Sequence, residues 1–397
     1  MKLTISFVFL ILSASVIYSD QLLEGLLRNA AIANGYLPPS KLDQSFDEEK
    51  SRIGKKIFEA SLMSFNSDTS CKSCHLKEFS SADGLPNAVG VGGSGEGHER
   101  LMSDGLIVPR NTLPLWGRGA IGFSTFFWDG KVQRGDGQLI SQFGDMAPSD
   151  DPLITAVHLP FVEIREMVVD DQTVDENYKD ETVSSARKIM DQLIAKLAKD
   201  ELGQELAISV KKNKDELAFI DVATVVAHHI KNQFALGESR FSKFMEGKDT
   251  LSKKQLQGGL IFYGKGNCAS CHSGAHFSDF KFHTIINPQM GFGKNGFGID
   301  YGRFNVTRDY QDLYKFRTPP LANVIKTAPY GHSGSVRTIE EIIVSHFDPL
   351  RYFDMQKLDV VRRRELFERI QTTDDQPNVA YLDNKEIDEL IEFLKTL

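Results

Sequence analysis

Apolar residues recur at helical spacing along this 397-residue chain. Ile53 and Ile57 fall on one face of a predicted helix, and Leu256, Leu260 and Tyr263 fall on one face of a second. Each of these helices stops a short distance before a segment that contains two cysteines. The same kind of helix therefore leads into two separate places where chemistry is expected.

Two predicted helices also begin with a capping box, in which the side chains of the first residue and of one three positions later bond each other's backbone amides. Ser252 and Gln255 have this spacing ahead of the second helix, and Asp383 and Glu386 have it ahead of a C-terminal helix. The C-terminal helix should pack against the second cysteine-containing module, because one of its sides is apolar. This apolar stripe consists of Ile387, Leu390, Ile391 and Leu394.

Further helices are predicted between the two modules. An amphipathic helix is expected over residues 189–197 and a more buried one over residues 217–230. Glycine-rich stretches at residues 90–97 and 291–298 are expected to be loops. Strand patterns are few. The predicted fold is therefore mainly α, with long loops and little β structure.

The first 19 residues have the layout of a secretory signal. Lys2 precedes an apolar run from Leu3 to Leu12, which is too short to span a bilayer comfortably, and short side chains lead to Ser19. Cleavage is predicted after Ser19, and the alternative is an uncleaved anchoring helix. Either way the folded part is expected outside the cytoplasm, since no later segment has enough consecutive apolar residues to cross a membrane.

Composition and charge narrow the classes of partner. Hydrophobic residues make up 41% of the chain and charged residues 25%, which suits a sizeable core and two or three domains. The formal net charge of −8 gives no reason to expect nucleic acid or an anionic membrane surface as a partner. A cationic redox partner is compatible with this charge.

All four cysteines lie in two CxxCH pentapeptides, CKSCH at residues 71–75 and CASCH at residues 268–272. Each cysteine pair can form thioethers to one haem, and the adjacent histidine can supply an axial nitrogen to the iron. A zinc site or disulfides are the alternatives, but two such motifs that use every cysteine favour haem c. The predicted residues are Cys71, Cys74 and His75 for the first haem, and Cys268, Cys271 and His272 for the second.

The polar stretch at residues 247–250 interrupts two helical patterns and lies between the two motifs. It predicts a boundary between two cytochrome c-like haem domains, residues 20–248 and residues 249–397.

Four further segments make the chain recognisable. They are FFWDGK at residues 126–131, the Glu-Met pair at 166–167, FRTPPLANV at 316–324 and TAPYGHSG at 327–334. With the two CxxCH motifs, they resemble the bacterial dihaem cytochrome c peroxidase and MauG superfamily from about residue 51 to the C-terminus.

The resemblance implies unequal roles for the two haems. The first haem, with His75 as its proximal ligand, would be the one that meets hydrogen peroxide, and the second would receive and relay electrons. The family's distal acid–base carboxyl falls on Glu166 and its distal amide on Gln138. Trp128 matches the tryptophan that lies between the haems and assists electron transfer. From the residues alone, Glu166 would more commonly be a solvated surface carboxylate, and Trp128 would be a core residue.

The distal ligands are also implied by the resemblance. His98, in a glycine-rich loop, is a candidate cap on the first iron that would require reductive activation, or else an exposed histidine. At the second iron His346 stands where the peroxidases have methionine, with Met355 as the alternative ligand. Histidine in place of methionine lowers a haem potential. MauG has a tyrosine close to this place, and the neighbouring residue here is Phe347, which cannot ligate.

A calcium ion between the haem domains is a further implication of the resemblance. The matching positions are Asn111, through its side chain, and Thr327 and Pro329, through their backbone carbonyls. Oxygen ligands of this kind suit calcium.

Three functions follow as hypotheses. The first is a periplasmic peroxidase that reduces hydrogen peroxide with electrons from a small cytochrome c or cupredoxin. The second is a MauG-type oxidase that modifies residues of a partner protein, which His346 and an insertion of about eighteen residues between Gln138 and Glu166 favour. The third is an electron carrier without catalysis, in which Glu166 would have no role. A homodimer is compatible with the resemblance.

Overall fold

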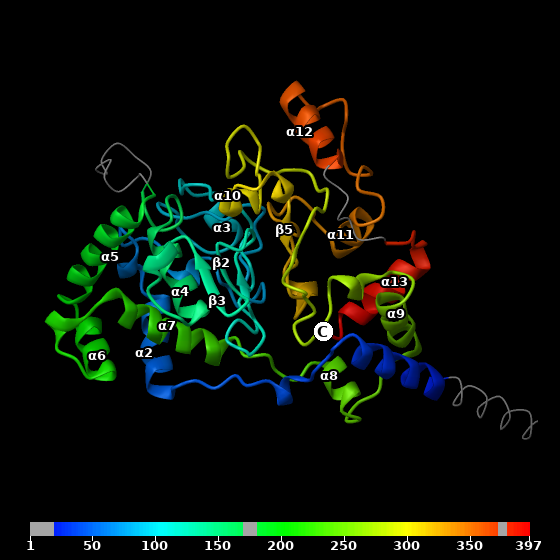
Figure 1. Ribbon diagram of the computed structural model, residues 1–397, viewed down its shortest axis with the longest axis horizontal. Coiled ribbons are helices and arrows are strands. Elements are labelled where there is room, and N and C mark those ends of the chain that lie inside the picture. The colour runs from blue at the N-terminus through cyan, green and yellow to red at the C-terminus, as the bar shows by residue number, and fades with distance from the viewer. Residues whose placement is uncertain (1–19, 170–180, 372–378) are drawn as a thin grey trace, which may run out of the picture.

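The computed structural model describes residues 20–169, 181–371 and 379–397. The predicted signal at residues 1–19 lies outside these described residues. Figure 1 shows an elongated molecule, with α5, α6 and α7 toward one end and α9 and α13 toward the other. Within the described ranges, no helix is long and apolar enough to cross a membrane.

The first lobe is built on two packed helices, α2 (Glu48–Glu59) and α7 (Phe219–Gln233). They approach closely at Gly54, where an added Cβ would lie 1.9 Å from the carbonyl oxygen of Val225. Ile53 and Ile57 are buried in this interface, as their spacing predicted. The other helices of the lobe are α3 (His98–Leu101), α4 (Pro152–His158), α5 (Val183–Leu197) and α6 (Glu201–Val210). The next helix in the chain, α8 (Arg240–Met245), already belongs to the second lobe.

The second lobe repeats this arrangement with α9 (Lys253–Tyr263) and α13 (Asn384–Leu394). Both begin with the predicted capping boxes. A Cβ added to Gly258 would lie 1.9 Å from the carbonyl oxygen of Glu389, so this crossing also depends on glycine. The remaining helices are α10 (Phe304–Thr307), α11 (Ile339–Ser345) and α12 (Val360–Gln371).

Strands are short, which confirms the prediction of a mainly α fold with little β structure. One antiparallel sheet joins β1 (Thr125–Phe126), β2 (Val132–Gly135) and β3 (Gln138–Ser141) in that order. A second pairs β4 (Phe282–His283) with β5 (Phe316–Arg317). Long loops connect these elements around the middle of the molecule (Figure 1).

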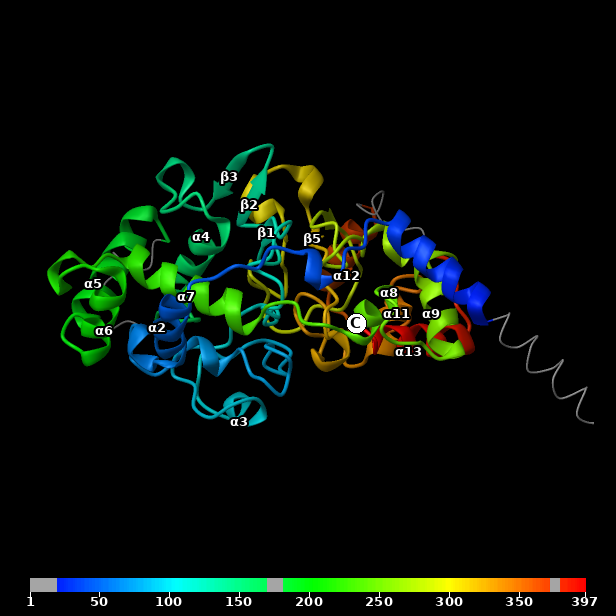
Figure 2. The same ribbon diagram turned by 90° about the horizontal axis from the view of Figure 1, so that it is seen from below.

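The hydrophobic cores do not divide the chain at the predicted boundary of 248/249. Residues 20–33 are helical and lie beside the second lobe (Figure 2), where Leu27 is fully buried in the second core. Phe241 and Phe244 of α8 are buried in the same core. The interruption at residues 247–250 is therefore only a loop inside the second packing unit, because apolar residues on both sides of it share one core.

Candidate functional site

Two large cavities lie in the described part of the molecule, each beside one CxxCH motif. The first cavity encloses about 1250 Å³, open mouth included, and Cys71, Cys74 and His75 line it. The second encloses about 1480 Å³, and Cys268, Cys271 and His272 line it. Four residues, which we call the partition, line both cavities: Asn111, Thr112, Leu113 and Trp128.

The first motif forms a short 3-10 turn, Cys71–Ser73, that places both sulfurs on the cavity wall. The Nδ1 atom of His75 lies 2.7 Å from the carbonyl oxygen of Ser81, which leaves Nε2 for a metal. Burial lowers the pKa of His75 to about 4, so the imidazole is neutral near pH 7, the form that ligates iron. His75 is therefore an oriented, neutral imidazole beside the two thiols, which is the set of groups that would hold a haem.

The second motif repeats this design with the 3-10 turn Cys268–Ser270. Here the Nδ1 atom of His272 lies 3.0 Å from the carbonyl oxygen of Phe277, and burial lowers the pKa of His272 to about 4. Both histidines thus have the hydrogen bond that orients an axial ligand.

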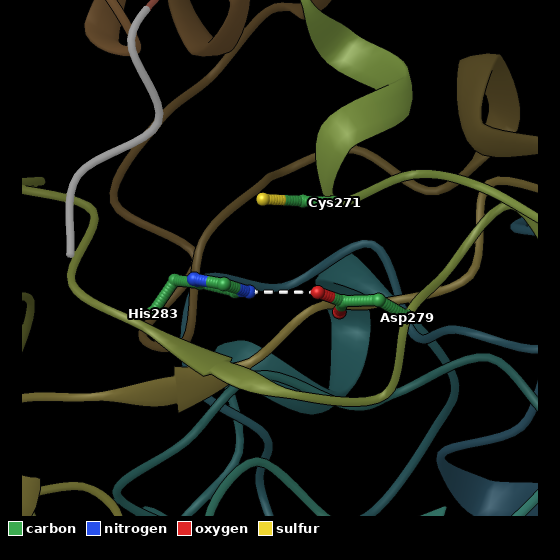
Figure 3. A group of neighbouring side chains, drawn as sticks. All are labelled: Cys271, Asp279 and His283. Carbon is green, nitrogen blue, oxygen red and sulfur yellow. Dashed lines mark hydrogen bonds and ion pairs between the residues drawn. The ribbon is translucent and has the colours of Figure 1, made fainter.

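A group of three side chains lies at the second motif (Figure 3). Cys271, Asp279 and His283 are close enough to share a metal ion. The Nε2 atom of His283 is 2.9 Å from Oδ2 of Asp279, and this hydrogen bond raises the pKa of His283 to about 10. The sulfur of Cys271 belongs to the CxxCH motif, and a thioether sulfur is a poor ligand for a separate ion. We therefore interpret His283 and Asp279 as an ion pair in which His283 lines the second cavity and Asp279 holds it from outside the lining.

Glu166 lines the first cavity together with His75. Burial, and then the nearby charge of Glu163, raise the pKa of the Glu166 carboxyl to about 7. A carboxyl of this kind can both hold and release a proton near neutral pH. Glu166 is therefore a cavity residue with a perturbed pKa and not an ordinary surface carboxylate.

A charged triad beside Glu166 escaped the sequence reasoning. The Nζ atom of Lys131 is 2.6 Å from Oε2 of Glu163, and Lys294 forms a second ion pair with the same carboxylate. All three side chains line the first cavity. Burial opposes ionisation of Glu163, but the two ammonium groups hold its pKa well below its usual range. Lys131 ends the FFWDGK segment and could have been found there, whereas Lys294 comes from the distant loop at residues 291–298.

Trp128 is 9% exposed and belongs to the partition. Its indole Nε1 donates to the carbonyl oxygen of Asn111 at 2.9 Å, so two partition residues hold each other in place. Trp128 was expected either to be a packed core residue or to lie between two cofactor sites. Its position is compatible with both expectations.

The sequence profile of the family described as di-haem cytochrome c peroxidase matches residues 48–250. The chain belongs to this family. Membership implies haem c as the cofactor of both cavities and an oxidoreductase activity. The two thiol pairs and two oriented histidines fit such groups.

Individual relatives come from both branches of the superfamily. The chain is 27% identical to the cytochrome c551 peroxidase of Pseudomonas aeruginosa over 76% of its own length and 72% of the relative's. It is 25% identical to the methylamine utilization protein MauG of Methylorubrum extorquens over 83% of its length and 79% of the relative's. The fold is similar to a MauG-like protein associated with microbial copper homeostasis, with a TM-score of 0.64, 21% identity and coverage of 91% and 92%.

Gln138, the residue matched to the family's distal amide, lies elsewhere in this fold. It is exposed at the start of β3, where it pairs with Gly135 across the tight turn of the β2–β3 hairpin. It is absent from the lining of the first cavity. The prediction that Gln138 acts beside Glu166 is therefore corrected, because the hairpin turns this residue away from the cavity.

His98 is exposed in α3 and does not line the first cavity. The neighbouring Arg100 is buried and donates to the carbonyl oxygens of Val89, Gly90 and Gly93 at 2.6, 2.7 and 3.0 Å. These bonds hold the loop in a conformation that keeps His98 outside. The structure thus agrees with an exposed loop histidine and not with a cap on the iron.

The two candidate distal ligands of the second iron, His346 and Met355, occupy different environments. His346 lines the second cavity together with His272, and its Nδ1 atom lies 2.6 Å from the carbonyl oxygen of Ile342, which leaves Nε2 for a metal. Met355 is 50% exposed and is not part of the lining. Of the two predicted distal ligands, only His346 has a suitable position.

Two of the three predicted calcium ligands come together. The side-chain amide of Asn111 donates to the carbonyl oxygens of Pro329 and Gly331, at 2.7 and 3.3 Å. In this orientation the amide nitrogen satisfies both carbonyl oxygens. No described contact joins the carbonyl of Thr327 to this group, and a calcium ion remains a prediction.

Proposed function

We propose that this chain is a dihaem peroxidase, in which hydrogen peroxide is reduced in the first cavity and electrons enter through the second. The observation that carries the proposal is the common lining of the first cavity by His75 and Glu166. Among the described histidines, His75 alone lines it, whereas His272 and His346 both line the second. One site open to a substrate and one closed site are what a peroxidase needs.

The proposed reaction consumes one hydrogen peroxide, two electrons and two protons and forms two water molecules. The haem held by residues 71–75 supplies the iron that binds the peroxide and transfers the electrons. Glu166 takes a proton from the incoming peroxide oxygen and returns it to the departing one as the O–O bond breaks. A carboxyl with a pKa of about 7 suits both halves of this transfer.

The triad of Lys131, Glu163 and Lys294 supports the same role for Glu166. It carries a net charge of +1 on the wall of the cavity, and the lysine charges oppose the rise in the pKa of Glu166 that burial and Glu163 cause. In place of Gln138, the ammonium group of Lys131 is the proposed hydrogen-bond donor to the peroxide.

Electrons would pass from the second cavity to the first across the partition. His272 and His346 are the residues that would hold the iron there, and Trp128, which lines both cavities, is the proposed contact between the two sites. The proposed donor is a small cytochrome c or cupredoxin, and the proposed location is the periplasm, after removal of residues 1–19. Electrons would flow in this direction because peroxide, the electron acceptor, is proposed to react in the first cavity.

The test is turnover of peroxide by the dihaem protein with a reduced small cytochrome as donor. Oxidised and half-reduced spectra should show a five-coordinate first iron and a six-coordinate second iron. Two six-coordinate irons in every state would refute the proposal and favour the electron carrier.

A MauG-type oxidase is the second candidate, and His346 favours it. An imidazole at this position stabilises ferric iron, which hinders the use of the second haem as a high-potential electron entry. The insertion between Gln138 and Glu166 also contributes α4, which packs against α7. A long-lived oxidised state after peroxide addition, without turnover on small donors, would select this candidate.

A further inference from the structure

Two of the three arginines that line the cavities have no carboxylate partner among the described residues. Arg118 lines the first cavity, and Arg317 lines the second. They are 9% and 2% exposed, and neither forms an ion pair. Burying an arginine charge without an anion is costly, so this arrangement needs an explanation.

The hydrogen bonds of Arg118 are weak compensation for its charge. Its Nε and Nη2 atoms donate to the carbonyl oxygens of Pro114 and Leu113 at 3.1 and 3.2 Å. Burial lowers the pKa of Arg118 to about 10, and no acid counteracts this effect. The Nη1 group has no hydrogen-bond partner among the described residues, so its donors are available to a ligand.

Arg317 is even less satisfied. Its Nη1 atom donates to the carbonyl oxygen of Thr125 at 2.9 Å, but its Nε is buried without any hydrogen-bond partner. Burial, and then the charge of Arg118, lower the pKa of Arg317 to about 9. The two guanidinium groups are thus near enough to repel each other.

Both arginines are attached to the partition between the cavities. Arg118 holds the carbonyls of Leu113 and Pro114, which follow Asn111 and Thr112 in the chain. The backbone N–H of Arg317 donates to the carbonyl oxygen of Trp128 at 2.8 Å. The uncompensated charges therefore lie where the edges of two bound groups would approach each other.

Arg110 is a cavity-lining arginine whose charge is compensated by carboxylates of the protein itself. It lines the first cavity too, but it forms ion pairs with Asp129 at 2.6 Å and Asp300 at 2.7 Å. Arg100 is buried without an ion pair too, but its guanidinium group donates four hydrogen bonds. The side chain of Arg118 donates two and that of Arg317 one, so we infer that the anions of these two arginines come from outside the polypeptide.

We propose that Arg118 and Arg317 bind haem propionates, Arg118 those of the first haem and Arg317 those of the second, and that they form one cationic junction between the haems. Each haem brings two carboxylates, and a guanidinium group binds a carboxylate in a bidentate manner. The junction would compensate both arginines and raise both haem potentials, because a fixed positive charge favours the reduced iron. This inference rests on the proposed occupancy of the cavities by haem, but not on the reaction with peroxide.

The experiment is a spectroscopic redox titration of the dihaem protein and of Arg118→Gln and Arg317→Gln variants, after haem content per chain has been measured. Arg118→Gln should lower the midpoint potential mainly of the first haem, and Arg317→Gln mainly that of the second. Arg303→Gln is the matched control, since Arg303 is buried and hydrogen-bonded but lines neither cavity. Shifts no larger than those in Arg303→Gln would overturn the proposal.

Lysine variants keep the test possible where a glutamine variant does not accumulate. In Arg317→Lys the resonance Raman propionate bending band of the second haem should move while that of the first stays, and Arg118→Lys should do the reverse. Unchanged bands at both haems would overturn the inference. If only the peroxidase proposal failed, the unaltered dihaem protein would not turn over peroxide, while the haem potentials and propionate bands of the variants would still shift as expected.

Discussion

Replacement of Glu166 by glutamine separates its catalytic role from its effect on stability. Glutamine has the shape of the neutral carboxyl but cannot exchange a proton. The carboxyl pKa rises from 4.5 to about 7 in the folded protein, which means that the fold favours the protonated form. Ionisation of this group in the native state therefore costs at most about 3 kcal/mol.

The sign of the stability change follows from this shift. Below a pH of 4.5 the carboxyl is protonated in both folded and unfolded chains, so Glu166 and glutamine are equivalent. Between that pH and about 7 the unfolded chain loses the proton while the folded chain keeps it, so stability falls as the pH rises. Glu166→Gln should thus be more stable than the unaltered protein by up to about 3 kcal/mol near pH 8.5, and no more stable near pH 4. Guanidinium unfolding at both pH values measures this difference.

Activity should change in the opposite direction. If Glu166 accepts the proton of peroxide, kcat/KM rises as the pH increases through about 7, and the variant loses this inflection together with about 10² to 10⁴ of the rate. Glu205→Gln is the control, because Glu205 pairs with Lys56 on the surface of the first lobe and should leave the pH profile unchanged. A variant rate within about twofold of the unaltered protein would refute the acid–base role. An equal stability gain at both pH values would refute the raised pKa.

Three further outcomes are expected. His346→Ala should convert the second iron to a high-spin form in the oxidised spectrum, while Met355→Ala should not, because only His346 lines the second cavity. His98→Ala should leave the oxidised spectrum and the peroxide reaction of unreduced protein unchanged, because His98 is exposed. If the variant instead changed whether the protein must be reduced before it reacts with peroxide, His98 would be a ligand of the first iron. Trp128→Phe removes the hydrogen bond to Asn111 and should slow electron transfer between the haems in stopped-flow traces, with both haem spectra preserved; an unchanged transfer rate would exclude Trp128 from the path.

Much of the candidate site could be predicted from the sequence, because its residues are close together along the chain. A CxxCH motif brings two sulfurs and an imidazole together within five residues, whatever the rest of the chain does. The helices before the motifs were likewise predictable, since Ile53 and Ile57 or the Ser252 capping box depend on neighbours three or four positions away. The position of Glu166 beside the first motif followed only from resemblance and agrees with the cavity that the structure contains.

The tertiary structure decided what depends on long loops, whose backbone has no periodic signal. One tight hairpin turned Gln138 outward, and one buried arginine, Arg100, kept the His98 loop away from the cavity. Lys294 and Arg317 reach the cavities from segments far from the first motif, and no spacing rule foretells such convergence. The helix at residues 20–33 joined the second core although it precedes the first, because apolar surface is buried wherever the fold brings it. Sequence alone thus predicted where two haems would attach, and the fold determined which charged groups surround these two sites.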